Sequence, residues 1–135
     1  MASQIFVNLP VKDLGKSREF FSKLGFSFNE QFSNEKAACL ILGENLYSML
    51  LTEPFFKSFT KKEIGDAKKA MEVLIGIDAK SRAEVDDIVK KAVAAGGSIY
   101  LEPQDHGWMY SHSFADLDGH QWEIIFMDES QLAQQ

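Results

Sequence analysis

The sequence predicts an α+β protein of two similar halves, each with the element order strand, helix, strand, strand, strand. Three observations lead to this prediction. The order of hydrophobic patterns is repeated along the chain, each of the two helical patterns ends at glycine, and each half alone has too few elements to cover both faces of its sheet. We therefore expect two βαβββ modules that join into one mixed sheet system, whose concave centre, called the cup below, is the default place for a ligand.

Length and composition predict one domain of ordinary size. The 135 residues are 45% hydrophobic and 25% charged, which is close to the average for globular proteins. A net charge of -6, with scattered lysines and arginines, disfavours nucleic acid and anionic membranes as partners. No basic leader precedes an apolar stretch and no apolar run approaches the roughly 20 residues that span a bilayer, so we expect a cytoplasmic protein. Cys39 is the only cysteine, and its apolar neighbours predict a buried thiol.

The first module, residues 3–53, contains every element of the repeat. Residues 5–11 are rich in β-branched and aromatic side chains and predict a strand, with Pro10 at an edge or a strand end. A helical period begins after Asp13, a plausible N-cap, and ends at Gly25. Three further strands are predicted at residues 26–32, 37–42 and 46–52.

Residues 54–70 connect the two modules and show no strand period. Their apolar segment, residues 55–59, holds three phenylalanines and is too apolar for a bare surface loop. We expect this excursion to be partly helical and to lie over the mouth of the cup or to reach a partner subunit.

The second module, residues 71–128, repeats the pattern. A helix is predicted at residues 81–95, with Ser81 as its N-cap and Glu84 completing a capping box. The strands are predicted at residues 71–77, 98–101, 108–115 and 120–127, and a loose polar tail at residues 129–135. Residues 7–11 and 73–77 superpose at a constant offset, which supports an internal repeat.

Four short motifs extend over nearly the whole chain. They are Val11-Lys12-Asp13-Leu14, Leu24-Gly25-Phe26, Ala95-Gly96-Gly97 and Asp116-Leu117-Asp118-Gly119-His120-Gln121-Trp122-Glu123. Together they resemble the vicinal oxygen chelate superfamily, which contains glyoxalase I, bleomycin-resistance proteins and extradiol dioxygenases. The resemblance implies two modules curled into a cup, and a homodimer whose interface helps to shape that cup.

The resemblance also implies where a divalent metal would bind, because enzymes of the superfamily hold it through His or Glu in the first and last strands of each module. The corresponding positions are Phe6, Ser48 (or Met49, if the register differs by one), Glu72 and Glu123. A phenyl ring cannot bind a metal, and a hydroxyl or thioether is not a usual ligand. Two carboxylates are fewer than the three protein ligands of most catalytic sites. We expect no cofactor, with a divalent metal on Glu72 and Glu123 as the alternative.

Glu123 and His112 are the predicted catalytic residues. Glu123 follows Trp122 in a strand whose alternate residues must be buried, and a carboxylate there would be costly without a partner. It could act as a general base toward carbon, although a structural role is equally open. His112 alternates with Tyr110 along a strand, and it matters for function only if that face lines the cup.

Aromatic residues gather where the cup is expected. They indicate either sheet core or a planar apolar ligand held between rings, as the resemblance to bleomycin-resistance proteins implies. The predicted ligand-binding residues are Phe6, Ser48, Glu72, Trp108, Tyr110 and Trp122. We therefore expect a glyoxalase-like or bleomycin-resistance-like protein that binds a small organic molecule without a complete metal site and sequesters or converts it. The alternative is a metal-dependent lyase or dioxygenase related to lactoylglutathione lyase.

Overall fold

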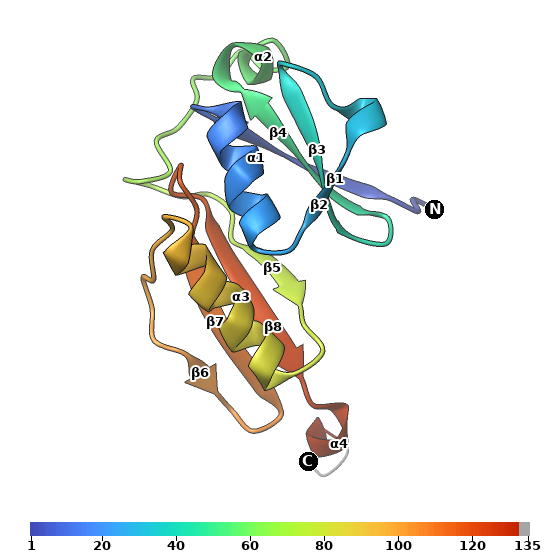
Figure 1. The fold of residues 1–135 in the computed structure, drawn as a ribbon, viewed down its shortest axis with the longest axis vertical. Helices are drawn as coiled ribbons and strands as arrows, with labels where there is room; N and C mark the ends of the chain where they lie inside the picture. The colour runs from blue at the N-terminus through green and yellow to red at the C-terminus, as the bar shows by residue number, and fades with distance from the viewer. Residues whose placement is uncertain (133–135) are drawn as a thin grey trace. The chain divides into compact units, whose positions relative to one another are not determined.

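Each half of the chain forms its own four-stranded mixed sheet in the computed structural model, which describes residues 1–132 (Figure 1). The chain divides into two compact units, Met1–Asp66 and Ala67–Gln135. The strand orders are β1-β4-β3-β2 and β5-β8-β7-β6, and in both sheets the first strand runs parallel to the last. The α+β class with two βαβββ modules is thereby confirmed.

The first unit has the elements predicted for it, a short helix in the connecting segment, and one unpredicted 3-10 turn. They are β1 (Ile5–Val11), α1 (Leu14–Lys23), β2 (Ser27–Asn29), the 3-10 turn η1 (Glu30–Phe32), β3 (Ala37–Gly43), β4 (Leu46–Thr52) and α2 (Glu53–Lys57). The carboxylate of Asp13 caps α1 by accepting a 3.0 Å hydrogen bond from the backbone N–H of Lys16. Gly25, with a φ of 101°, follows the helix in the left-handed conformation that glycine favours.

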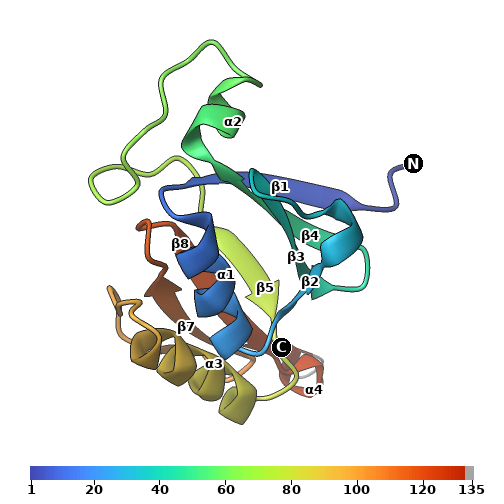
Figure 2. The ribbon, with the colours of Figure 1, turned by 45° about the horizontal axis from the view of Figure 1, so that its top comes forward.

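Helix α1 covers one face of the first sheet (Figure 2). Phe20 and Phe21 on the helix are buried, as are Leu9, Leu40 and Leu50 on three adjacent strands. Because side chains alternate along a strand, the neighbours of these leucines point to the opposite face. That opposite face carries the candidate site described below.

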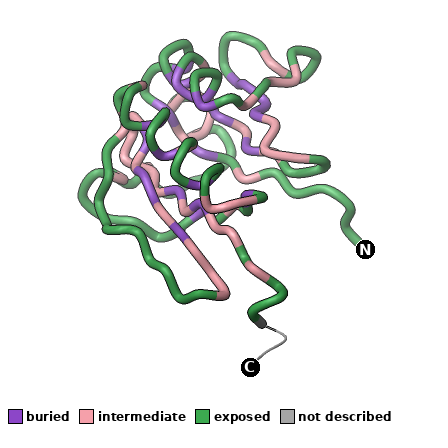
Figure 3. The backbone as a smooth tube through the Cα atoms, turned by 60° about the horizontal axis from the view of Figure 1, so that its bottom comes forward, coloured by how far each residue is buried: buried purple, intermediate pink, exposed green. Residues whose placement is uncertain are grey.

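The second unit repeats this arrangement. It contains β5 (Ile75–Asp78), α3 (Arg82–Ala94), β6 (Gln104–Asp105), β7 (Met109–Ala115), β8 (Gln121–Met127) and α4 (Glu129–Leu132). Ser81 is the N-cap of α3, because its hydroxyl accepts a 3.0 Å hydrogen bond from the backbone N–H of Glu84. Val85 and Val89 of α3 are buried with Trp122 and Ile124 of β8. Figure 3 shows that buried stretches alternate with exposed ones along the strands and helices.

Several predicted strands differ from those in the structure. The strand expected at residues 26–32 ends at Asn29, whose side chain accepts a hydrogen bond from the N–H of Gln31 and starts η1. The strand expected at residues 71–77 begins only at Ile75. The prediction of a strand at residues 98–101 is wrong: Ser98 alone forms a bridge with β7, and the paired strand is β6.

The ends of the second unit also differ from expectation. The tail predicted to be loose from residue 129 begins with α4, while residues 133–135 lie outside the described residues. Within residues 1–132, no helix has the length and apolar character needed to cross a membrane.

Candidate functional site

The face of the first sheet opposite α1 carries a row of uncharged side chains. Pairing of β1 with β4 sets Phe6 opposite Tyr47 and Asn8 opposite Met49, so all four side chains point to this face. Cys39 on β3 lies opposite Met49 and joins the same row. We call this surface the open face of the first sheet.

A hollow of about 380 Å³ lies on the open face, and we call it the Phe6 hollow. It is lined by Phe6, Asn29, Phe32, Cys39, Tyr47 and Met49, with Gln4 at its margin. The rings of Phe6 and Tyr47 stack with centroids 5.1 Å apart and planes within 14°. Phe6 is 48% exposed and Phe32 is 64% exposed, so the hollow presents aromatic surface to solvent.

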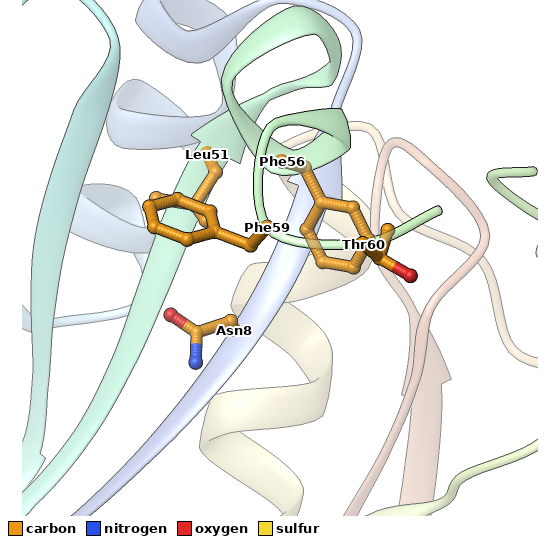
Figure 4. A pocket seen from close by; sticks show the side chains of 5 residues that line it. All are labelled: Asn8, Leu51, Phe56, Phe59 and Thr60. Carbon is orange, nitrogen blue, oxygen red and sulfur yellow. The ribbon is translucent and has the colours of Figure 1, made fainter. Parts of the chain in front are cut away.

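A second hollow of about 400 Å³ lies further along the same face and is lined by Asn8, Leu51, Phe56, Phe59 and Thr60 (Figure 4). We call it the Phe59 hollow. Helix α2 follows β4 without a loop, which folds the apolar segment 55–59 back over its own sheet. The rings of Phe55 and Phe59 meet edge to face with centroids 5.0 Å apart. The expected partly helical excursion is therefore present, and its phenylalanines form one wall of a hollow.

Ser48 does not belong to the open face. Its side chain lies on the α1 side, is fully buried, and donates a 2.9 Å hydrogen bond to the carbonyl of Val7. The neighbouring residue Met49 points to the open face instead. Of the two residues between which the predicted register was left open, Met49 is the one on the open face.

The open face of the second sheet carries Glu123. Pairing sets this residue opposite Ser113 on β7 and Gly76 on β5. The side chain of Tyr100 makes a hydrogen bond with Ser113 and lies near the carboxylate of Glu123. Burial raises the pKa of the Tyr100 hydroxyl, the bond from Ser113 opposes this, and the charge of Glu123 raises it further. A carboxylate and two hydroxyls are thus brought together.

Tyr110 and His112 lie on the other face of this sheet, under α3. The hydroxyl of Tyr110 donates a 2.6 Å hydrogen bond to Oδ1 of Asp86 on α3. Nδ1 of His112 lies 3.9 Å from the same oxygen, and the buried ring nitrogens have no hydrogen-bond partner within residues 1–132. His112 was expected to matter for catalysis only if its face of the sheet lined the cup. In the structure that face is covered by α3.

Trp122 is also buried on the α3 side, where its ring stacks with that of Phe114 at 6.4 Å. Its indole nitrogen donates a 3.0 Å hydrogen bond to Oδ2 of Asp116. Trp108 precedes β7, and its carbonyl accepts a hydrogen bond from the N–H of Asp128. Of the predicted ligand-binding aromatic residues, Phe6 lies on an open face and lines a hollow, whereas Tyr110 and Trp122 lie on the face under α3.

The most specific motif of the sequence is a structural turn. Oδ1 of Asp116 accepts hydrogen bonds of 3.0 Å from the backbone N–H groups of Asp118 and His120, while Oδ2 binds Trp122. Burial raises the pKa of the Asp116 carboxyl, and the nearby His120 and the bond from Trp122 partly offset this. Gly119, with a φ of 89°, completes the turn.

The helix caps show how the two modules correspond. Asp13 caps α1 and Ser81 caps α3, and aligning these two residues sets Phe6 opposite Leu74. From the sequence, Glu72 was predicted instead as the counterpart of Phe6, because residues 73–77 were superposed on residues 7–11. Glu72 is exposed and precedes β5.

The last strands correspond through their pairing with the first strands. Asn8 pairs with Met49, and Gly76 pairs with Glu123. Since the cap alignment sets Asn8 opposite Gly76, Met49 corresponds to Glu123.

The four positions at which the resemblance implies metal ligands are therefore Phe6, Met49, Leu74 and Glu123. Only Glu123 offers a donor suited to a divalent cation. In residues 1–132, no group of three or more His, Cys, Asp or Glu side chains is arranged to hold a metal ion. The residues present do not fit the divalent metal of the superfamily's enzymes.

Comparison with known proteins establishes the family. The model of the glyoxalase/bleomycin resistance protein/dioxygenase superfamily matches residues 4–124, and the chain belongs to this superfamily, which is the vicinal oxygen chelate superfamily. A comparison with curated proteins gave no match.

Solved structures resemble the chain over most of its length. The hypothetical protein SA1046 from S. aureus is 29% identical, with 93% of this chain and 94% of that chain covered and a TM-score of 0.79. A glyoxalase-related enzyme from Fulvimarina pelagi is 20% identical, with coverages of 93% and 88% and a TM-score of 0.77. The fosfomycin resistance protein FosX from Listeria monocytogenes is 21% identical, with both coverages 93% and a TM-score of 0.67. The last two identities show the shared fold alone.

Residues that line the hollows or lie near Glu123 but were not predicted as site residues from the sequence include Asn8, Phe32, Phe59 and Tyr100. Strand alternation from Phe6 would have placed Asn8 on the same face. The apolar segment that contains Phe59 was recognised, but its position over the sheet depends on α2 starting directly after β4.

Proposed function

We propose that the protein binds a small organic molecule with an aromatic or apolar ring in the Phe6 hollow, without a divalent metal. The observation that carries this proposal is the stacked pair of Phe6 and Tyr47. This pair lies on an exposed face of the sheet and not in the core. A ligand ring placed on this pair would extend the stack and remove apolar surface from water.

The chemistry of the hollow supports binding rather than conversion. Its lining combines aromatic rings with a thiol, a thioether and side-chain amides, and it contains no carboxylate, imidazole or amine. Burial raises the pKa of the Cys39 thiol, which disfavours the reactive thiolate. The superfamily includes bleomycin resistance proteins, and FosX among the structural neighbours is a fosfomycin resistance protein, so this fold has precedents in resistance to small organic antibiotics.

The test uses N-phenyl-1-naphthylamine, an uncharged aromatic dye whose fluorescence rises in apolar surroundings. We expect saturable binding that the Phe6→Ala variant weakens about tenfold, because the lost ring contact corresponds to roughly 50 Å² of buried apolar surface. Ile5→Ala is the matched control, since Ile5 is 55% exposed on the same strand and points to the other face. Equal dye affinity of the Phe6→Ala variant and the wild type would contradict the proposal.

A second candidate function is proton transfer by Glu123 without a metal. The observation that favours it is the proximity of the Tyr100 and Ser113 hydroxyls to this carboxylate on the open face of the second sheet. The Glu123→Gln variant separates the two functions. A binding protein keeps its dye affinity in this variant, whereas an acid–base enzyme loses turnover of its substrate.

A further inference from the structure

We propose that the ligand site extends from the Phe6 hollow past Asn8 into the Phe59 hollow, and that its ligand is uncharged and elongated, with an apolar group at each end and a hydrogen-bonding group between them. This inference rests on the proposed function and adds the class of molecule that the site accepts.

A single cross-strand pair contributes one residue to each hollow. Asn8 lines the Phe59 hollow, and its partner Met49 lines the Phe6 hollow. Phe6 and Asn8 are two residues apart on one strand and point to the same face, which separates them by about 7 Å along that strand. A molecule that fills the Phe6 hollow therefore needs only about one further ring length to reach the second hollow.

The second hollow offers an apolar end for such a molecule. Phe59 is 69% exposed although its ring contacts that of Phe55, so much of its apolar surface faces solvent. Figure 4 shows the side chains of Leu51, Phe56 and Phe59 close to one another near α2, with the side chain of Asn8 on β1 beside them. An apolar group placed there would cover Phe59 and be flanked by α2.

The side chain of Asn8 supplies the polar contact between the two ends. An amide has two N–H donors and an oxygen acceptor. Its nitrogen makes one long hydrogen bond of 3.4 Å to the carbonyl of Phe6, which leaves a donor and the acceptor for a ligand. A ligand amide, carbonyl or hydroxyl would fit this position.

The absence of charge on the lining determines the charge of the ligand. None of the residues that line the two hollows is charged, although a quarter of the chain consists of Asp, Glu, Lys and Arg. A charged ligand would lose its hydration there without an ion pair in return. We infer a neutral molecule.

The experiment compares benzamide, which has one ring and an amide, with N-benzylbenzamide, which has a second ring beyond the same amide. Both are measured by displacement of N-phenyl-1-naphthylamine from the wild type and from variants. We expect N-benzylbenzamide to bind about tenfold more tightly, since the second ring buries roughly 50 Å² or more of apolar surface.

Three variants locate this gain. Phe59→Ala removes the advantage of N-benzylbenzamide and leaves the affinity for benzamide unchanged, whereas Phe32→Ala weakens both compounds because Phe32 lines the first hollow. Asn8→Ala weakens both compounds about fivefold, because both carry the amide that loses its hydrogen bond. Ile5→Ala changes neither.

The outcomes separate the two proposals. If the dye binds in a Phe6-dependent way but the two amides have equal affinity, or do not bind, or Phe59→Ala has no effect, the extended site is overturned and the proposed function stands. If dye binding does not depend on Phe6, both are overturned.

Discussion

The indole Nε1 of Trp122 donates a 3.0 Å hydrogen bond to Oδ2 of Asp116, and this bond ties the core of the second unit to the turn that precedes β8. Both partners are buried, so neither can exchange the bond for one to water. The motif that makes the sequence recognisable as a member of its superfamily therefore stabilises the fold.

We expect Trp122→Phe to lower the free energy of unfolding by about 2–4 kcal/mol, because it leaves Oδ2 of Asp116 without its donor and removes buried volume. Urea denaturation followed by circular dichroism measures this change. A loss below about 0.5 kcal/mol, which is within the error of the method, would show that the bond is not needed.

Asp116 also predicts a pH dependence of stability. Its pKa in the folded state is raised above the ordinary value of 3.8, first of all by burial. The folded state then holds its proton more tightly than the unfolded state, so the stability contribution is full below pH 3.8 and is lost as the pH rises through the folded-state pKa. As the pH rises, we expect the wild type to lose free energy of unfolding relative to Asp116→Asn, because the asparagine side chain does not titrate. Urea denaturation at a series of pH values measures this change.

Asp128→Asn provides a control of opposite sign. A hydrogen bond from Ser130 lowers the pKa of Asp128, so this carboxylate stabilises the fold above pH 3.8 and the effect is lost as the pH falls. Equal slopes for the two variants would contradict both assignments.

Gly119→Ala should destabilise the protein by about 2–3 kcal/mol. The residue has a φ of 89°, and a β-carbon there would lie 2.7 Å from Cγ and 2.9 Å from the backbone nitrogen of Lys68. Gly25→Ala is the matched comparison: its φ is 101° but its β-carbon would have nothing within 4 Å. We expect a cost of about 1 kcal/mol there, from backbone strain alone. Thermal denaturation of both variants measures the difference, and equal melting temperatures would be inconsistent with a steric role of Lys68.

Tyr110 should ionise only at strongly alkaline pH. Its hydrogen bond to Asp86, followed by burial, raises its pKa to about 12. Since the folded-state pKa is the higher one, this residue stabilises the fold below pH 10 and the contribution is lost as the pH rises toward 12. Absorbance at the tyrosinate band during a pH titration should show one late step in the wild type that moves to lower pH in Asp86→Asn.

Added Zn²⁺, Ni²⁺ or Mn²⁺ should not raise the melting temperature of the protein, because Phe6, Met49 and Leu74 occupy three of the four implied ligand positions. A chelator should leave dye binding unchanged for the same reason. A stabilisation by several degrees that Glu123→Gln abolishes would restore the metal-dependent lyase or dioxygenase as the leading function.

The sequence predicted those features that depend on local chemistry. The caps Asp13 and Ser81 fixed the start of both helices, because a side chain that accepts from an N–H three residues on acts within one turn. Strands β1, β3 and β4 were placed to within one residue by their apolar runs and by the turns between them.

Features that depend on pairing between strands were harder to predict. A shift of one residue moves a side chain to the other face, which is why Ser48 was considered for a position that Met49 holds. The edge strand β6 was misplaced because two separate segments pair with β7, first Ser98 alone and then Gln104–Asp105. Nothing in the local sequence indicates that residues 99–103 are unpaired. The correspondence of Leu74 with Phe6 required the helix caps, since the apolar residues near β5 can be superposed in more than one way.

The position of Cys39 gives the protein a built-in chemical reporter. It is the sole cysteine of the chain, it is 2% exposed, and it lines the Phe6 hollow. A thiol reagent can therefore modify the native chain at one atom only, and only when the surrounding side chains move apart. The rate of that modification would therefore report how often the hollow opens. A bound ligand would lower this rate, so binding could be followed without an added label.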